Sequence, residues 1–417
     1  MARLLLLNDN SDQENWGAQA IPFAIVRILN EHIQGLSVKS FSNSWLRRQF
    51  RRLHAIPALN VTYEVHRRGR SLPSVAEHAL AWLSTPEEFF PRVADDFEFF
   101  GDLWESGRAG PMGKEFLEAV NDADVVVHNG ENSVYRNTVD GCRALFLLWL
   151  SKARLRRPTC AINQTTVLAS VPRPVMPGMA RLVYPLLDVV TVREPYSLRD
   201  LHALGVQNTQ LVPDAVFYLD ETPDASKALG AWRQRVGLGE GPYFCLSGSA
   251  LPMSEPCPGW DGAVAELITQ LKRILPQAVL MAKDPPARFL ERVARATGSI
   301  YFGPEHSFQE LWPLLRGARL LVSGYFHHIL VASLVGCPFI PLSANNHKMD
   351  GLLEYLNWHT RRPYDATAVR YCMESILAEA LQLLDRREEL SQHLLQRSSE
   401  LKAETVGIAT LISKLIA

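Results

Sequence analysis

The segment LLVSGYFHHILVASLVGCPFIPLS, residues 320–343, constrains the fold more than any other part of the chain. Residues 320–323 are a short apolar run of the kind that is covered on both faces of a sheet. Gly324 interrupts this run, and residues 327–336 then carry the apolar and small side chains of a packed helix. Pro338 cannot continue a helix, and another apolar run follows it. This order predicts a βαβ unit, with polar residues at the carboxyl end of a strand, where such folds bind ligands.

Apolar runs of strand length recur in both halves of the chain. They occupy residues 3–7, 125–127, 159–163, 189–192 and 211–212 in the first half, and residues 243–247 and 278–282 in the second. Helical spacing of apolar residues follows Gly17 and recurs over residues 263–275 and 308–315. We therefore predict an α/β fold with two Rossmann-like domains that face each other across a cleft.

The domain boundary is predicted from composition. Residues 221–242 are rich in Gly, Pro and small polar side chains, which is typical of a linker. We expect an N-terminal Rossmann-like domain over residues 1–222 and a C-terminal one over residues 241–365. Residues 366–417 contain no strand signal, and we expect them to form helices that brace the domains.

Composition and charge exclude several classes of protein. A formal net charge of −1 argues against nucleic-acid binding, which usually requires a clearly basic domain. The six cysteines are scattered without a C-x-x-C pair, which favours a reducing compartment. No apolar run approaches the ~18 residues of a membrane span, and the apolar run in MARLLLLNDNSD is too short for a signal peptide. We expect a cytoplasmic protein.

Several familiar site motifs do not occur. The chain has no G-x-x-x-x-G-K-[ST] phosphate loop and no G-x-G-x-x-G dinucleotide fingerprint. Adjacent His327 and His328 would lie about 100° apart on a helix, so they could not easily share one metal ion. We expect no metal site.

Five motifs in chain order resemble those of the polysaccharide pyruvyl transferases. They are Asn15-Trp16-Gly17-Ala18-Gln19-Ala20, Asp124-Val125-Val126-Val127 with Gly130, the segment from Val190 to Gly205 that contains Val192-Arg193-Glu194, the pair Pro213-Asp214, and the opening segment with Lys348 after it. The resemblance covers most of the chain and implies a two-domain arrangement like that of GT-B glycosyltransferases. In that arrangement the N-terminal domain would bind the acceptor and the C-terminal domain the donor.

The resemblance also implies a reaction. Members of this family transfer the enolpyruvyl carbons of phosphoenolpyruvate to two hydroxyls of one sugar, which gives a cyclic ketal. The donor carries a carboxylate and a phosphate, which cations and a helix N-terminus can receive. A histidine is suited to the proton transfers. Phosphoenolpyruvate is then a co-substrate, and no cofactor is expected.

The site residues follow from the matched positions and from the strand ends that face the expected cleft. His327 and Arg193 are the expected catalytic residues. The expected donor-binding residues are Lys348, Gly324, Tyr325 and His328. The expected acceptor-binding residues are Asp9, Asn15, Gly17, Asn129 and Glu131.

One departure from the family pattern leaves the donor open. Tyr325 stands where the family has an arginine, and a phenol cannot offer a permanently charged, bidentate fork to a carboxylate or phosphate. Either another cation replaces that arginine or the donor differs. The alternative is a glycosyltransferase of the same scaffold that uses a nucleotide-activated sugar. A binding protein without activity is a third interpretation, which His327 and Lys348 disfavour.

A basic segment suggests a further partner. Residues Trp45–Arg52 place apolar side chains on one helical stripe and four arginines on other faces, and Arg67-Arg68-Gly69-Arg70 follows. Such a segment is either a surface helix of the first domain or a contact with anionic lipid or a lipid-linked acceptor. The second interpretation would bring the protein to the inner face of the membrane.

Overall fold

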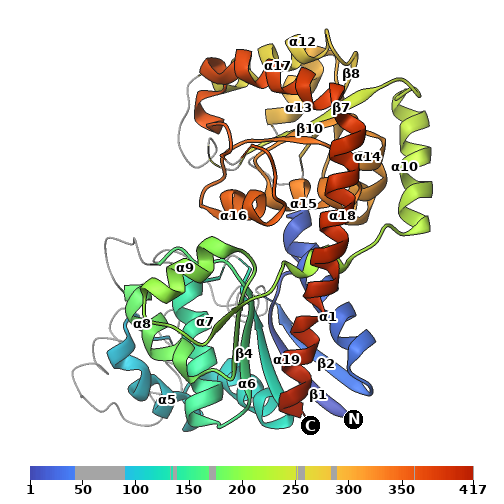
Figure 1. Ribbon diagram of the computed structural model, residues 1–417. Helices are drawn as coiled ribbons and strands as arrows, with labels where there is room; N and C mark the ends of the chain where they lie inside the picture. Colours follow the sequence, from blue (N-terminus) through green and yellow to red (C-terminus); the bar gives the residue numbers. More distant parts are fainter. Residues whose placement is uncertain are drawn as a thin grey trace.

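The computed structural model shows two α/β lobes that are joined by helices (Figure 1). It describes residues 1–42, 90–131, 133–134, 139–168, 175–249, 251, 259–282, 289–360 and 362–416. The segments Trp45–Arg52 and Arg67–Arg70 lie outside the described residues, and so does Cys257.

The first lobe is built on a six-stranded parallel sheet with the strand order β2-β1-β3-β4-β5-β6. Its strands are β1 (Ala2–Asp9), β2 (Leu36–Ser42), β3 (Val125–Asn129), β4 (Thr159–Gln164), β5 (Val189–Val192) and β6 (Thr209–Leu211). Leu4 and Leu6 of β1 pack into one core and Leu5 and Leu7 into another, as the alternation of side chains along a strand requires. Both faces of the sheet are therefore covered.

The helices of the first lobe lie between these strands in the chain, except for the last short segment, which follows β6. They are α1 (Trp16–His32), α5 (Phe97–Glu105), α6 (Gly110–Asp122), α7 (Val139–Trp149), α8 (Val175–Val183) and α9 (Pro195–Ala203), with the short helical segments η3 (Ala94–Asp96), η4 (Leu150–Arg154), η5 (Tyr184–Leu186) and η6 (Ala215–Tyr218).

The second lobe is built on a five-stranded parallel sheet with the order β11-β10-β7-β8-β9. Its strands are β7 (Tyr243–Gly248), β8 (Gln277–Met281), β9 (Ile300–Phe302), β10 (Leu320–Ser323) and β11 (Phe339–Pro341). Its helices are α12 (Trp260–Leu271), α13 (Phe289–Thr297), η8 (Phe308–Glu310), α14 (Leu311–Gly317), α15 (Phe326–Leu334) and α16 (Lys348–Tyr355). The βαβ unit predicted from residues 320–343 is β10-α15-β11.

The segment predicted as a linker is largely a helix, α10 (Pro223–Val236). Thr222 caps it by accepting a hydrogen bond from the Ala225 N–H, and Pro223 occupies its first position. Gly237 ends it in the left-handed conformation, with φ of 70°. Proline at the start and glycine just past the end are helix boundary signals, so the segment between the two sheets is a helix rather than an irregular linker.

The tail is helical, as predicted, and it contacts both lobes. It consists of η9 (Ala366–Ala368), α17 (Val369–Asp385), α18 (Arg387–Thr405) and α19 (Gly407–Ile416). Helix α17 packs on α12, α18 packs on α15 and on η6, and α19 packs on α1. Figure 1 shows α18 running from the upper lobe to the lower one.

One continuous apolar core extends through both lobes. It includes the inner face of the first sheet, α1, η6, the second sheet and the tail helices. Trp16 connects the lobes directly, since its Nε1 donates a 2.8 Å hydrogen bond to the His306 carbonyl and its ring lies 5.4 Å from that of Phe302. The lobes are thus packed against each other rather than tethered.

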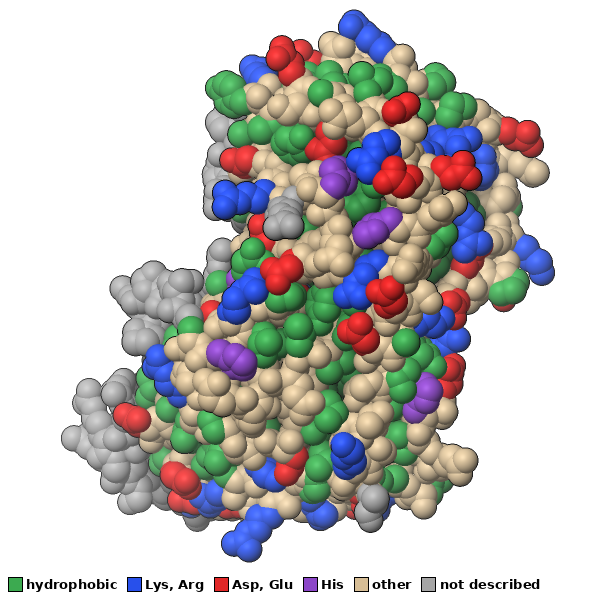
Figure 2. All heavy atoms as spheres, viewed as in Figure 1, with side chains coloured by type: hydrophobic (Ala, Val, Ile, Leu, Met, Phe, Trp, Pro, Cys, Tyr) green, Lys and Arg blue, Asp and Glu red, His purple; other side chains and the backbone are tan. Residues whose placement is uncertain are grey.

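Two further observations bear on the sequence predictions. Acidic and basic side chains are interspersed over both lobes on the face that Figure 2 shows. Within the described part of the chain, no helix is long and apolar enough to cross a membrane.

Candidate active site

Parallel sheets bind ligands where the strand order reverses, beyond the carboxyl ends of the strands. In the first sheet this point lies between β1 and β3, and in the second between β10 and β7. Asn15 and Glu131 follow the first pair of strands, and His327 follows β10 in the first turn of α15. The fold therefore directs these three residues toward the junction of the lobes.

His327 is in direct contact with the first lobe. Its Nε2 lies 3.6 Å from Oδ2 of Asp214, which follows β6 and caps η6. This separation is too long for a hydrogen bond but short enough for a strong electrostatic interaction. The imidazole is nearly covered, with 10% of its side chain exposed.

Gly17 leaves the space that the imidazole occupies. A Cβ atom on Gly17 would lie 2.0 Å from Nδ1 of His327 and 2.4 Å from its Cγ. Gly17 is helical and needs no unusual φ, so the absence of a side chain is its contribution. The sequence predicted an acceptor contact at Gly17, whereas the structure places it against His327.

A buried ion cluster lies beside His327. The Arg193 guanidinium pairs with Glu131 and, at 2.8 Å, with Asp214, and its Nε donates a 2.6 Å hydrogen bond to Thr165. Its Cζ lies 4.7 Å from the ring centroid of Phe326, beside His327 in α15. The cluster joins the ends of β3, β4, β5 and β6 to the first turn of α15.

Charge balance keeps both carboxylates of the cluster ionised. Burial alone would raise the pKa of Asp214, but Arg193 and His327 hold it well below its ordinary value. Burial also acts to raise the pKa of Glu131. The charges of Arg193, His327 and Lys348 outweigh burial, so the pKa of Glu131 is lowered overall. Lys348, the first residue of α16, thus acts on the same carboxylate as Arg193 and His327.

Four predicted site residues are placed differently from the expectation. Arg193 is fully buried between two carboxylates, so it orders the cluster and does not face an open surface. Asn129 is fully buried and uses its side chain to bond the Asn8 carbonyl and the Glu131 N–H, so it joins the loops after β1 and β3. His328 is buried beside Trp16, and burial followed by the charge of His327 lowers its pKa to about 3, so it is a neutral ring. The N–H of Gly324 bonds the Gly248 carbonyl at 2.6 Å and is not available to a donor anion.

Three other predicted residues have local structural roles as well. Asn15 caps α1 by accepting a hydrogen bond from the Ala18 N–H. Asp9 accepts from the Ser11 N–H in the loop after β1. Tyr325 stands at the cap position of α15, with its N–H bonded to Ser323 Oγ and its ring 5.1 Å from that of His328.

Two residues in the junction were not predicted as site residues. Asp214 belongs to a matched Pro-Asp pair, which was the signal that could have identified it. Glu194 caps α9 and accepts hydrogen bonds from the Tyr196 and Ser197 N–H groups. Glu194 also lies 3.4 Å from His347 Nε2 and against Gly351, where a Cβ would approach its carboxylate to 2.3 Å. Glu194 therefore joins α9 of the first lobe to α16 of the second.

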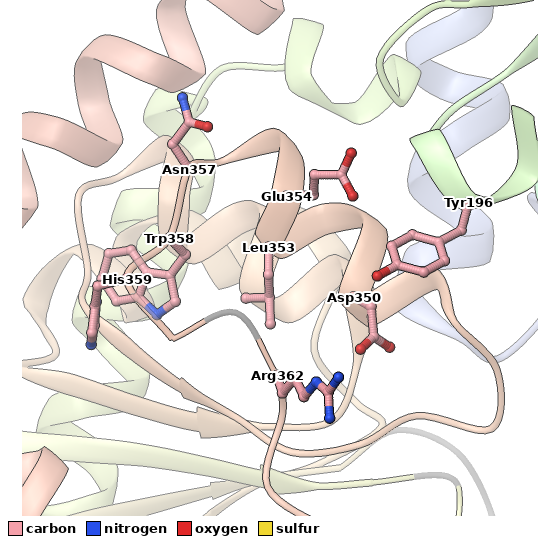
Figure 3. Close-up of a pocket in the computed structure, with 8 residues that line it drawn as sticks. All are labelled: Tyr196, Asp350, Leu353, Glu354, Asn357, Trp358, His359 and Arg362. Carbon is pink, nitrogen blue, oxygen red and sulfur yellow. The ribbon is translucent and has the colours of Figure 1, made fainter. Parts of the chain in front are cut away.

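A pocket of about 600 Å³ opens beside this contact (Figure 3). Tyr196 of the first lobe forms one wall, and α16 with the residues that follow it forms the other. The pocket lies on the face of α16 that carries Asp350, Leu353 and Glu354.

The first testable prediction concerns Gly17. Gly17→Ala should displace the His327 ring, because the new methyl group would overlap Nδ1. Since a misplacement of about 1 Å in an active site can reduce the rate about 10²-fold, we expect a loss of that order in turnover. Gly178→Ala is the matched control, because a Cβ there meets no atom within 4 Å. Equal activity of the two variants would contradict the assigned packing.

The second prediction concerns acid stability. The pKa values of Asp214 and Glu131 are lowered from 3.8 and 4.5 on folding, so their contribution to stability is complete above those values and is lost as pH falls below them. Asp214→Asn should therefore reduce the slope of the unfolding free energy between about pH 4 and pH 3 by up to ~1.4 kcal/mol per pH unit. Denaturant unfolding at a series of pH values measures this slope, and Asp122→Asn, at an exposed position, is the control. Identical slopes for Asp214→Asn and wild type would show that Asp214 gains no charge stabilisation on folding.

Comparison with solved structures agrees with the two-lobe GT-B-like fold. The UDP-GlcNAc 2-epimerase of Methanocaldococcus jannaschii is 13% identical, with a TM-score of 0.51 and 92% of each chain covered. The UDP-GlcNAc 2-epimerase of Neisseria meningitidis bound to UDP-GlcNAc is 11% identical, with a TM-score of 0.53 over 100% of this chain and 99% of that one. At these identities the likeness shows the fold alone, and the predicted fold class is confirmed.

Sequence comparison identifies the family. No curated protein matches the chain. The family model described as polysaccharide pyruvyl transferase matches residues 15–346, which include the ion cluster and His327. The match spans well over half of the chain and agrees with the resemblance seen in the motifs. The chain is a transferase and belongs to the polysaccharide pyruvyl transferase family.

Proposed function

We propose that the chain transfers the pyruvyl group of phosphoenolpyruvate to two hydroxyls of one sugar, in a cell-surface polysaccharide or its lipid-linked precursor. The observation that carries the proposal is the contact of His327 with Asp214 between the two lobes, in a chain of the polysaccharide pyruvyl transferase family. No cofactor takes part. The basic segment Trp45–Arg52 is the proposed contact with a lipid-linked acceptor, on sequence grounds alone.

In the proposed reaction His327 carries a proton to the donor. The methylene carbon of phosphoenolpyruvate gains this proton while the first acceptor oxygen bonds to C2. The second acceptor oxygen then displaces phosphate from C2, which closes the ketal. Of the two hydroxyl protons, one ends in the new methyl group and the other leaves with phosphate. Asp214, whose pKa is held low, remains ionised and faces Nε2 of His327 at 3.6 Å.

The positive charge for the donor comes from a small number of groups. Arg193 is already paired with Glu131 and Asp214, so Lys348 and protonated His327 are the cations proposed for the carboxylate and phosphate of the donor. Helices α15 and α16 both begin at the carboxyl ends of adjacent strands, β10 and β11, and their N-termini add positive potential there. Tyr325, at the cap of α15, contributes a phenol where the family has an arginine.

Replacement of His327 tests its role as a proton carrier. His327→Asn should lower kcat by roughly 10² or more in a chain that stays folded, because general acid–base catalysis contributes about that much. Phosphate release from phosphoenolpyruvate in the presence of acceptor glycan measures kcat. His202→Asn, at an exposed position in α9, is the control and should retain wild-type activity. A His327→Asn enzyme within a few-fold of wild type would remove His327 from the mechanism.

Variants of Tyr325 test the donor. If the donor is phosphoenolpyruvate, Tyr325→Phe loses one hydrogen bond of about 1 kcal/mol and should weaken donor binding only several-fold. Tyr325→Arg should preserve or improve the use of phosphoenolpyruvate, because it restores a charged fork. Phosphate release by wild type and both variants is the measurement. No release by any of the three, together with saturable binding of a nucleotide sugar, would favour the glycosyltransferase instead.

A further inference from the structure

The pocket of about 600 Å³ beside the Glu194–His347 contact has the features of a built binding site. Its volume lies within the range of small-molecule pockets, about 300–1,000 Å³. Tyr196 comes from the first lobe, and Asp350, Glu354 and Trp358 come from the second. A ligand in this pocket would therefore contact both lobes at once.

The aromatic walls of the pocket are held in place without a ligand. The Tyr196 ring lies between His347, stacked at 5.5 Å, and Arg199, whose Cζ is 4.1 Å from the ring centroid. Arg199 in turn pairs with Glu354 at 3.0 Å. On the opposite side Trp358 stacks on Phe339 at 4.3 Å. The walls are thus ordered by contacts behind them, which lowers the entropy cost of binding.

Trp358 supplies a buried donor that the fold does not use. Trp358 is 2% exposed, and its Nε1 has no hydrogen-bond partner among the described residues. Leaving such a group unsatisfied costs about 1–3 kcal/mol, so a native structure is expected to provide a partner for it. Because Trp358 lines the pocket, a ligand there is a candidate partner for this N–H.

Two charged groups in the pocket also lack ion pairs within the described part of the chain. Asp350 is half-buried and has no salt bridge, and burial raises the pKa of its carboxyl group. Arg362 also lines the pocket, and its charge acts to lower the Asp350 pKa without a salt bridge between the two described residues. Figure 3 shows Tyr196, Asp350 and Arg362 directed toward the same space. They offer a carboxylate acceptor, a guanidinium donor and a phenol to one ligand.

These groups define the chemistry of the ligand. The charges of Asp350 and Arg362 are opposite and act on each other, so the pocket favours a neutral ligand over a strongly charged one. Asp350 and Glu354 both line it, which disfavours a phosphate or a diphosphate. Donors and acceptors placed around two aromatic side chains suit a ring that carries several hydroxyls. Metal binding is not indicated, since the described residues contain no group of three or more potential metal-binding side chains.

We propose that this pocket binds a neutral, hydroxyl-rich sugar ring of the acceptor glycan, with Trp358 and Asp350 as its main hydrogen-bonding groups. The inference rests on the proposed function, because it takes the acceptor to be a glycan. It assigns acceptor recognition to both lobes rather than to the N-terminal domain alone. The pocket adjoins the contact between Glu194 and His347, and His347 immediately precedes Lys348. A sugar bound there would be one unit of a chain that continues toward the ion cluster.

Sugar binding can be measured without a donor. We expect saturable binding, by saturation-transfer NMR with the full chain, of at least one methyl glycoside from a panel of glucose, galactose, mannose, N-acetylglucosamine and N-acetylmannosamine. The methyl glycosides of glucosamine and glucuronic acid are the charged comparators. Binding of none of the neutral glycosides, or of a charged comparator alone, would overturn the inference.

Two variants locate the bound sugar. Trp358→Phe keeps an aromatic ring but removes the indole N–H, and it should raise the Kd about 2- to 10-fold. Asp350→Asn keeps the shape but removes the charge, and it should raise the Kd about tenfold or more. The controls are Trp260→Phe, whose indole bonds the Ala366 carbonyl at 2.7 Å, and Asp261→Asn, which pairs with Arg292 on the surface. Trp260→Phe should lower the melting temperature more than Trp358→Phe, and neither control should change the Kd. Unchanged affinity in both pocket variants would place the sugar elsewhere.

Kinetics separate this inference from the proposed function. In a chain active with phosphoenolpyruvate, the pocket variants should raise the KM for the acceptor and leave the KM for phosphoenolpyruvate unchanged. An equal acceptor KM in wild type and variants would refute the pocket assignment alone. Conversely, a chain that binds the sugar through Trp358 and Asp350 but releases no phosphate from phosphoenolpyruvate would refute the donor and not the pocket.

Discussion

The pairing of Arg193 with Glu131 and Asp214 is the interaction on which the site depends. A fully buried guanidinium is tolerated only when carboxylates compensate it, and removal of one partner from such a pair typically costs about 3–5 kcal/mol. The cluster fixes the ends of β3, β5 and β6 relative to one another. Because Asp214 also faces His327, the same charges set the position of the second lobe's helix α15 against the first lobe.

His327 is held from three sides by different kinds of interaction. The carboxylate of Asp214 lies beside Nε2 of His327. Gly17 has no side chain, which leaves room for Nδ1 of the imidazole. Phe326, the residue before His327, packs against the guanidinium of Arg193. The charge of Asp214, the space beside Gly17 and the packing of Phe326 therefore favour the same position of the His327 ring. Such agreement is what a proton-transfer group requires, since its geometry must be fixed before the substrate arrives.

Much of the fold could be predicted from the sequence, and less of the site. Apolar runs such as residues 125–127 and 320–323 identify buried strands because both faces of a parallel sheet are covered. Strand β2 was not predicted because its side chains are mostly half-buried or exposed, which weakens the pattern. Helix α10 was taken for a linker because its proline and glycine, which mark helix ends, also mark loops. The pairing of Arg193 could not be predicted from the sequence, because it depends on which carboxylates the fold brings next to the guanidinium.

The packing of α19 has a consequence for how the chain acquires its structure during synthesis. Ile408, Ala409 and Ile412 of α19 are buried, and the helix contacts α1, β3 and β5 of the first lobe. At the usual rate of about 5–20 residues per second, α19 is synthesised roughly 10–40 s after β6. Until then the first sheet lacks part of its apolar cover, although all six of its strands have been made. The N-terminal half of this protein therefore cannot complete its folding until α19 has been synthesised, and it must wait with exposed apolar surface that a chaperone could bind.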